Sequence, residues 1–261
     1  MRSSRPCPMI ISTMESLIMI RLRPLATIGS LCLAVLAWHI YATSFGHALV
    51  FPTPLKVFTA LLKLLWTLET YRIIAYTLGR LILAAFMAAL FGYLLGLLAG
   101  RYAWVEGLFR PWVTGLRTLP VVSIIVILLV LLPVRNQVVY VITFLMLFPL
   151  IYEAARQSVL QMPVDLKDVL ALEPNTWWFR MVHIDIPLSL PTVKTTALQS
   201  VGLGFKVLIT AEFISRATPS VGHILFTGTE MIDYTPVFAW TLLIIMIVAG
   251  LEVLVQRLKA S

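Results

Sequence analysis

The sequence predicts an all-α polytopic membrane protein with about six transmembrane helices. Of its 261 residues, 60% are hydrophobic and only 12% are charged, whereas a soluble globular domain carries about 25% charged residues. Several apolar runs are long enough to cross a bilayer, which takes about 20 residues. Backbone groups find no water inside hydrocarbon, and the alternation typical of membrane strands is absent, so helices are the expected spanning form.

Six apolar runs are the predicted spans. The third is interrupted by Pro120, the fourth is short, and the fifth opens near Pro187 and Pro191. In chain order the spans are residues 25–41, 73–100, 112–132, 138–152, 188–214 and 237–255.

A further helix is expected between the first two spans. Pro54 suits the first turn of a helix, and one face is apolar while the other is polar. This pattern is typical of an amphipathic helix at the membrane interface; a peripheral or re-entrant packing helix stays equally open. The apolar positions are Leu55, Phe58, Leu61, Leu62 and Leu65, and the polar ones are Lys56, Thr59 and Lys63.

Basic residues predict the orientation. A net charge of +8 can indicate nucleic-acid binding, but in this chain it fits retention of basic residues on the cytoplasmic side. With the N-terminus inside, Arg2, Arg5, Arg21, Arg23, Arg101, Arg110, Arg117, Arg156, Lys167, Arg180, Lys194, Arg257 and Lys259 fall inside, and Lys56, Lys63, Arg72, Arg135 and Arg216 fall outside. Both termini and residues 154–187 are therefore predicted to be cytoplasmic.

No small-residue cleavage site follows the first apolar stretch, so residues 1–24 are expected to be a cytoplasmic segment.

The second span carries a face of small residues. Gly92, Gly96 and Gly100 recur every four residues, which lets two helix backbones approach closely. The partner is either a neighbouring span or a second copy of the chain.

The segment 154–187 is unusually polar for this chain. Pro163 and Asp165 favour a helix start, and Pro174 ends that helix. The stretch TWWFRMVHI then forms a second short element. The prediction is a short cytoplasmic helix that another protein can grip.

This segment resembles the cytoplasmic loop of inner-membrane permease subunits of bacterial ABC importers, whose pattern is EAA, three residues, Gly, nine residues and I-x-L-P. Asp168 stands at the Glu, and Ile184, Ile186 and Pro187 keep the end of the pattern. The two Ala and the Gly are replaced by Val169, Leu170 and Pro174. The similar EAAR at 153–156 is rejected, because its spacing would put the final Pro at a Leu.

Longer stretches resemble the nitrate, sulfonate, taurine and bicarbonate branch of these permeases: FPTPLKVFTAL, TLGRLILAAFMAALFGYLLGLLAG, RPWVTGLRTLPVVSIIVILLVLL, and ITAEFISRA followed by VGHIL. The resemblance implies an ABC importer type I-like permease domain over residues 25–257, with a coupling helix in 154–187, between the segment 1–24 and a cytoplasmic tail, 258–261. It also implies a multi-pass protein of the bacterial inner membrane.

The resemblance further implies partners. They are two ATP-binding subunits that hold ATP and Mg, a second copy of the permease, and a solute-binding protein outside, besides membrane lipid. The chain itself has no GxxxxGK[ST] loop, and it is expected to be no enzyme and to bind no cofactor, metal or nucleic acid. The residues expected to dock the ATP-binding subunits are Asp165, Lys167, Asp168, Pro174, Trp177, Trp178 and Arg180.

Charged and polar residues inside the spans are the candidates for the solute pathway, because such residues usually face a cavity or a partner. Lys206 with Thr210 forms a polar face that suits an anionic solute; an ion pair of Lys206, most simply with Glu212, stays equally open. Thr118 and Ser123 flank Pro120 and are further pathway candidates. Arg80 is expected to snorkel to the outer interface, and Glu212 is expected to be structural.

Two other functions compete with an importer subunit. A stand-alone secondary transporter would show internal repeats and broken helices, and no repeat is evident. An intramembrane enzyme would need a nucleophile with its base, paired acids or a metal motif, and none stands at a suitable spacing.

Overall fold

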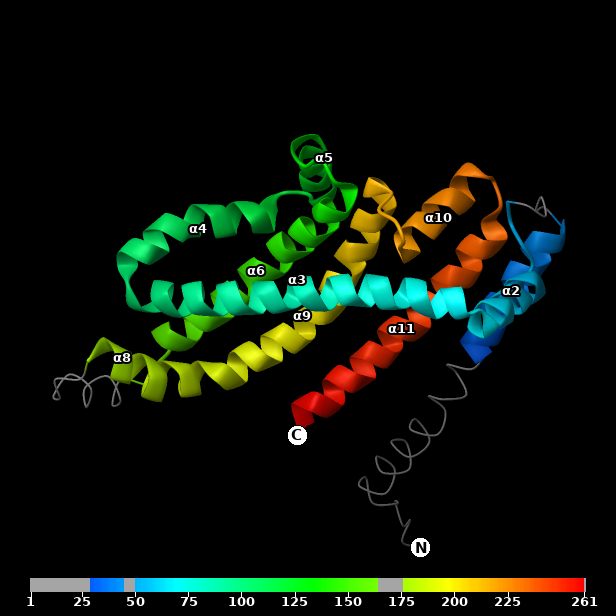
Figure 1. The fold of residues 1–261 in the computed structure, drawn as a ribbon. Coiled ribbons are helices and arrows are strands. Elements are labelled where there is room, and N and C mark those ends of the chain that lie inside the picture. Colours follow the sequence, from blue (N-terminus) through cyan, green and yellow to red (C-terminus); the bar gives the residue numbers. More distant parts are fainter. Residues whose placement is uncertain (1–28, 45–49, 164–175, 261) are drawn as a thin grey trace, which may run out of the picture.

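The computed structural model describes residues 29–44, 50–163 and 176–260, and the fold is helical throughout them (Figure 1). The first described helix is Gly29–Ser44. The others are α2 (Pro54–Trp66), α3 (Leu68–Arg101), α4 (Ala103–Thr118), α5 (Val121–Leu131), α6 (Arg135–Leu160), α8 (Trp177–Arg180), the π-helical turn η1 (Met181–Asp185), α9 (Ile186–Ser215), α10 (Val221–Glu230) and α11 (Tyr234–Ala260). The prediction of an all-α polytopic membrane protein is confirmed.

Four helices among the described residues are long and apolar enough to cross a membrane: Leu68–Arg101, Arg135–Leu160, Trp178–Ser215 and Tyr234–Arg257. The pair α4 and α5 makes up to a fifth span, and Gly29–Ser44 is a shorter apolar helix. The predicted span at 138–152 was too short, because α6 continues through Pro149 to Leu160. A proline is tolerated there because neighbouring helices satisfy the backbone groups that it frees.

The third predicted span, at residues 112–132, is broken at Pro120 as expected, and its first helix begins earlier than predicted, at Ala103. α4 and α5 meet at an angle of 110°, because Pro120 disfavours helical geometry at the residue before it. Leu119 is accordingly extended, with φ −73° and ψ 138°. Thr118 and Ser123, the two pathway candidates beside Pro120, both lie exposed at this break.

The core is built on the crossing of α3 and α6. Figure 1 shows α3 running along the length of the molecule, with α6 and α9 crossing it obliquely. Gly92, Gly96 and Gly100 face α6, so a neighbouring span occupies the small-residue face. A Cβ at Gly96 would overlap the Tyr152 carbonyl oxygen, and one at Gly100 would lie 2.7 Å from Val159 Cβ. Only glycine permits this approach.

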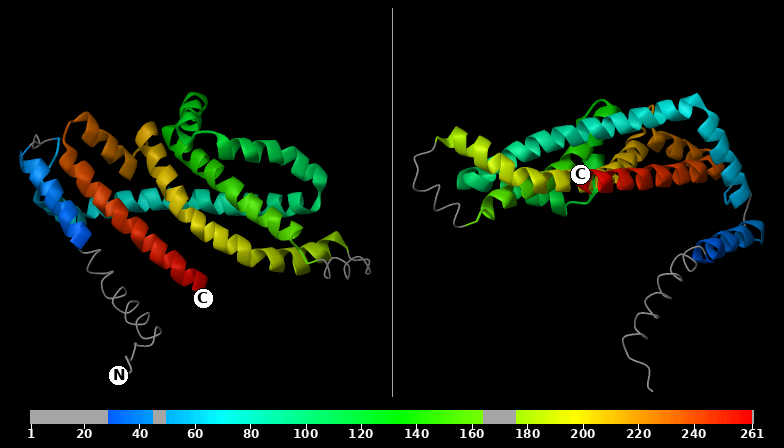
Figure 2. Two further views of the ribbon diagram at one scale, coloured as in Figure 1. Left: turned by 180° about the vertical axis from the view of Figure 1, so that it is seen from behind. Right: turned by 90° about the horizontal axis from the view of Figure 1, so that it is seen from below.

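α2 packs against α11. Val57 and Leu61 are buried with Ala239, Trp240 and Leu243, while Leu55, Phe58 and Leu62 are exposed. The predicted apolar face was therefore only partly the packed one, because α11 touches the side that carries Val57. The helix Gly29–Ser44 joins this end of the molecule (Figure 2), where Trp38 stacks on Phe238 with ring centroids 5.6 Å apart.

The two ends of the segment predicted at 154–187 are helical in the structure. Residues 154–160 continue α6, and residues 177–187 belong to α8, η1 and the first turn of α9. Asp165, Lys167, Asp168 and Pro174 lie outside the described residues. The π turn η1 joins α8 to α9 without a break, and such turns are frequent at functional sites.

The α3–α6 contact generates a stability prediction. Gly96→Ala should destabilise the protein by about 1–3 kcal/mol, because the added methyl group must push the two helices apart. Thermal unfolding of the purified protein in detergent measures the effect. Gly79→Ala is the matched control in the same helix, since nothing lies within 4 Å of a Cβ there; equal melting temperatures for the two variants would contradict the close approach.

Candidate functional site

A buried ion pair lies where α3, α9 and α10 meet. Arg80 Nη1 donates to Glu212 Oε1 at 2.8 Å, and the two side chains are 4% and 0% exposed. The hydroxyl of Thr77 also donates to the carboxylate, at 3.1 and 3.2 Å. A buried charge is tolerated only when it is paired and hydrogen-bonded, and the Glu212 carboxylate meets both conditions.

The same carboxylate holds the start of α10. The Gly222 N–H donates to Glu212 Oε2 at 3.2 Å, and the Val221 N–H donates to Thr77 Oγ1 at 3.2 Å. A Cβ at Gly222 would overlap Glu212, so glycine is required for this approach. Ser220 completes the helix start, because its hydroxyl accepts from the His223 N–H at 3.0 Å.

This network corrects two predictions. Arg80 does not snorkel, because Glu212 satisfies it inside the bundle. Lys206 does not pair with Glu212, since the two residues are six positions apart on α9 and project from different sides. Glu212 is buried, whereas Lys206 is exposed.

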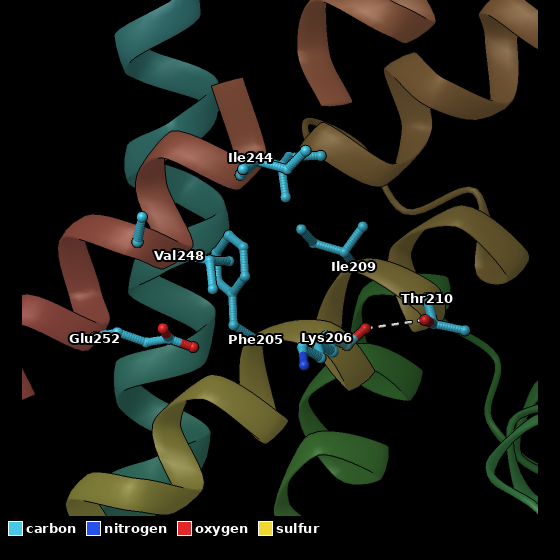
Figure 3. Close-up of a pocket in the computed structure, with 9 residues that line it drawn as sticks. Phe205, Lys206, Ile209, Thr210, Ile244, Val248 and Glu252 are labelled. Carbon is cyan, nitrogen blue, oxygen red and sulfur yellow. Dashed lines mark hydrogen bonds between the residues drawn. The ribbon is translucent and has the colours of Figure 1, made fainter. Parts of the chain in front are cut away.

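Lys206 instead lines a groove between α9 and α11 (Figure 3). The groove holds a cavity of about 500 Å³. Thr210 lies one turn along α9 from Lys206, and its hydroxyl donates to the Lys206 carbonyl at 2.9 Å. Glu252 reaches the same cavity from α11. The remaining walls are apolar and comprise Phe205, Ile209, Ile244, Ile245, Val248 and Ala249.

The groove continues beyond Glu252. A second cavity of about 200 Å³ is also lined by Glu252, together with Gly202, Gln199 and Gln256 among others. Gly202, Lys206 and Thr210 share one helical face, as predicted from their spacing. Sequence reasoning missed Glu252, although an acidic residue inside the predicted span 237–255 was a signal. Its place beside Lys206 needed the packing of α11 against α9.

Two formal charges of opposite sign therefore share one groove within candidate spans. Neither Lys206 nor Glu252 makes an ion pair within 4.0 Å in the part of the chain that the structure describes. Charges held against hydrocarbon are costly. The groove must consequently face water or another protein surface and not lipid tails.

The pathway candidates are not all brought together. Lys206 and Thr210 share the groove, whereas Thr118 and Ser123 do not line it. The Thr118 hydroxyl donates back to the carbonyls of Thr114 and Gly115, at 3.2 and 3.1 Å.

The opposite end of α9 carries a second set of polar contacts. Arg101 Nη1 donates to Asp185 Oδ2 at 3.0 Å, joining the end of α3 to η1. One turn away, the hydroxyls of Tyr93 and Ser189 lie 3.0 Å apart. These contacts fix the start of α9 against α3 at the end that leads into the predicted docking segment.

The described docking candidates lie at this end. Trp177 begins α8, and the Trp178 side chain is 61% exposed. Arg180 lines a cavity of about 330 Å³ with Arg101, Asp185 and the ends of α3 and α6. Among the residues that the structure describes, no group of three or more His, Cys, Asp or Glu side chains could hold a metal ion.

Comparison with known proteins supplies the family. Residues 88–261 match the model of the family described as binding-protein-dependent transport system inner membrane component. The chain is also similar to the taurine transport system permease protein TauC of Escherichia coli (strain K12), with 25% identity over 243 residues. That match covers 89% of this chain and 86% of the relative.

The buried network generates a second stability prediction. Arg80→Met leaves the Glu212 carboxylate buried without its cation, so the variant should lose about 3–5 kcal/mol of stability. Arg72→Met is the control, because Arg72 and Glu69 form an exposed pair at 3.7 Å that contributes about 0–1 kcal/mol.

The double variant Arg80→Met/Glu212→Gln should recover part of that loss, since it removes the uncompensated charge. Thermal unfolding in detergent measures all the variants. Additive losses in the double variant would contradict a direct interaction between the two charges.

Proposed function

The chain belongs to the family of binding-protein-dependent transport system inner membrane components, and we propose that it forms the solute pathway of an ATP-driven importer. The coarser part of this function, a permease subunit of an ABC importer in the inner membrane, follows from the family. Three further points are proposed: the position of the solute pathway, the charge of the solute, and the partner subunits of the transporter.

The observation that supports the pathway is the groove between α9 and α11. Lys206 is exposed within the candidate span Trp178–Ser215, where a charge facing lipid would be costly. A water-filled passage removes that cost. The groove is also large enough, at about 500 Å³, to hold a small solute with some of its water.

The solute is proposed to carry an anionic group. The ammonium of Lys206 attracts an anion, and the apolar walls strengthen that attraction because they lower the local dielectric constant below that of bulk water. The relative of E. coli is a permease of a taurine transport system, and taurine carries a sulfonate. A solute-binding protein outside the membrane is proposed to deliver the solute.

ATP-binding subunits are proposed to dock on the segment 154–187 and to hold ATP and Mg. Asp165, Lys167, Asp168, Pro174, Trp177, Trp178 and Arg180 are the proposed contacts. The bonds Arg101–Asp185 and Tyr93–Ser189 couple the start of α9 to α3, so a push on α8 is passed to both spans. A second copy of the chain is proposed to complete the gate, with both termini in the cytoplasm.

The mechanism is a shift between two arrangements of the spans. ATP binding closes the partner subunits and favours one arrangement of the docked segments. The partner can drive the gate only as far as it binds the two arrangements unequally. The rigid core of α3 and α6 then carries the displacement toward the groove.

The pathway assignment predicts the effect of removing one charge. Lys206→Met should lower ATP-dependent uptake of a labelled sulfonate by at least tenfold in proteoliposomes that hold the whole transporter. Lys194→Met is the matched control, because Lys194 is exposed on the same helix but does not line the groove. Equal uptake by the two variants would remove Lys206 from the pathway.

The docking assignment predicts a loss of assembly. Asp168→Arg should abolish co-purification of the ATP-binding subunit, while the chain still inserts in the membrane. Arg257→Glu, a charge reversal at the predicted cytoplasmic end of α11, should leave co-purification unchanged. Uptake by the chain alone, driven by an ion gradient, would instead favour a secondary transporter.

A further inference from the structure

Glu252 has no place in a pathway that recognises only an anion. A carboxylate in the groove repels the anionic group that Lys206 attracts, because like charges disfavour one another in a site of low dielectric constant. Glu252 nevertheless lines both cavities of the groove. Its presence therefore calls for a cation close to it.

Among the described residues, no Lys, Arg or His forms an ion pair with Glu252. Lys206 is the cationic residue that shares the cavity, yet it makes no ion pair with Glu252 within 4.0 Å. Figure 3 shows the two side chains on different walls, Lys206 on α9 and Glu252 on α11, with Phe205 between them. The apolar side chains Ile209, Ile244 and Val248 complete the space.

We propose that Lys206 and Glu252 form a two-point site for a dipolar ion, a small solute with an anionic group and an ammonium group joined by a short carbon chain. The anionic group lies at the ammonium of Lys206. The ammonium lies at Glu252, and the carbon chain lies against the apolar walls. This inference rests on the proposed function and deepens it, because it names the class of solute and a residue that selects it.

The arrangement selects by charge at both ends. A dipolar ion satisfies both charges of the groove, so neither is left unpaired when the solute displaces water. A simple anion leaves Glu252 without a partner, and a simple cation leaves Lys206 without one. Sites built around polar partners reject analogues that lack a partner group far more strongly than apolar pockets reject a missing methylene.

Protection of a thiol in the groove tests the site directly. The assembled transporter carries Val248→Cys, at an apolar wall of the groove, in a background in which Cys7 and Cys32 are replaced by Ala. Labelling by N-ethylmaleimide is measured in the presence of taurine, which has both charges, ethanesulfonate, which lacks the ammonium, and ethylammonium, which lacks the anion. Taurine should protect the thiol at a concentration at least tenfold below that of either analogue.

Variants separate the two charges. Glu252→Gln should remove the advantage of taurine and leave protection by ethanesulfonate unchanged or improved. Lys206→Met should abolish protection by both sulfonates. Glu69→Gln is the matched control, because Glu69 lies in an exposed pair outside the groove, and it should change nothing.

The outcomes distinguish this inference from the proposed function. Equal protection by taurine and ethanesulfonate would overturn the two-point site and leave the anionic pathway standing. An equal loss of both protections in Glu252→Gln would make Glu252 a structural partner of Lys206 or of a second copy, which also overturns the site. A thiol that is not labelled, or that no probe protects, would overturn the pathway assignment together with this inference.

Discussion

The buried pair of Arg80 and Glu212 is the constraint on which the meeting of α3, α9 and α10 depends. One carboxylate accepts hydrogen bonds from α3, through Arg80 and Thr77, and from the first turn of α10, through Gly222. Each of these groups would be costly to bury alone. Because they satisfy one another, α3, α9 and α10 can meet in one arrangement only. The carboxylate of Glu212 thus holds α3, α9 and α10 in one relative position.

The start of α9 is fixed in a comparable way. Asp185 accepts from Arg101, and Ser189 lies within hydrogen-bond distance of Tyr93, so both ends of α9 are tied to α3 by polar contacts. Lys206 and Thr210 lie on the same final third of α9 as Glu212, but they are exposed whereas Glu212 is buried. One side of this stretch is therefore held by the Arg80 pair, and the other side is open to the groove.

The electrostatics of the groove follow from this frame. Internal charges that serve only stability are paired within the bundle, as Arg80 and Glu212 are. Lys206 and Glu252 line one cavity without forming an ion pair within 4.0 Å among the described residues, so each charge is available to a bound solute. At the α4–α5 break, in contrast, Thr118 and Ser123 are exposed but line neither cavity of the groove. The Thr118 hydroxyl donates to carbonyls of its own helix.

The sequence by itself determined the membrane class, the helical spans and the family, because apolar length and local patterns such as Pro54 and the glycine spacing are properties of one segment. It also indicated that Lys206 and Glu212 matter. Only the tertiary structure decided that Glu212 pairs with Arg80, that α6 packs on the face of Gly92, Gly96 and Gly100, and that Glu252 and Lys206 line one cavity. The physical reason is that a pairing is a relation between two helices: spacing along one helix shows which residues share a face, and the packing of helices alone shows what that face meets.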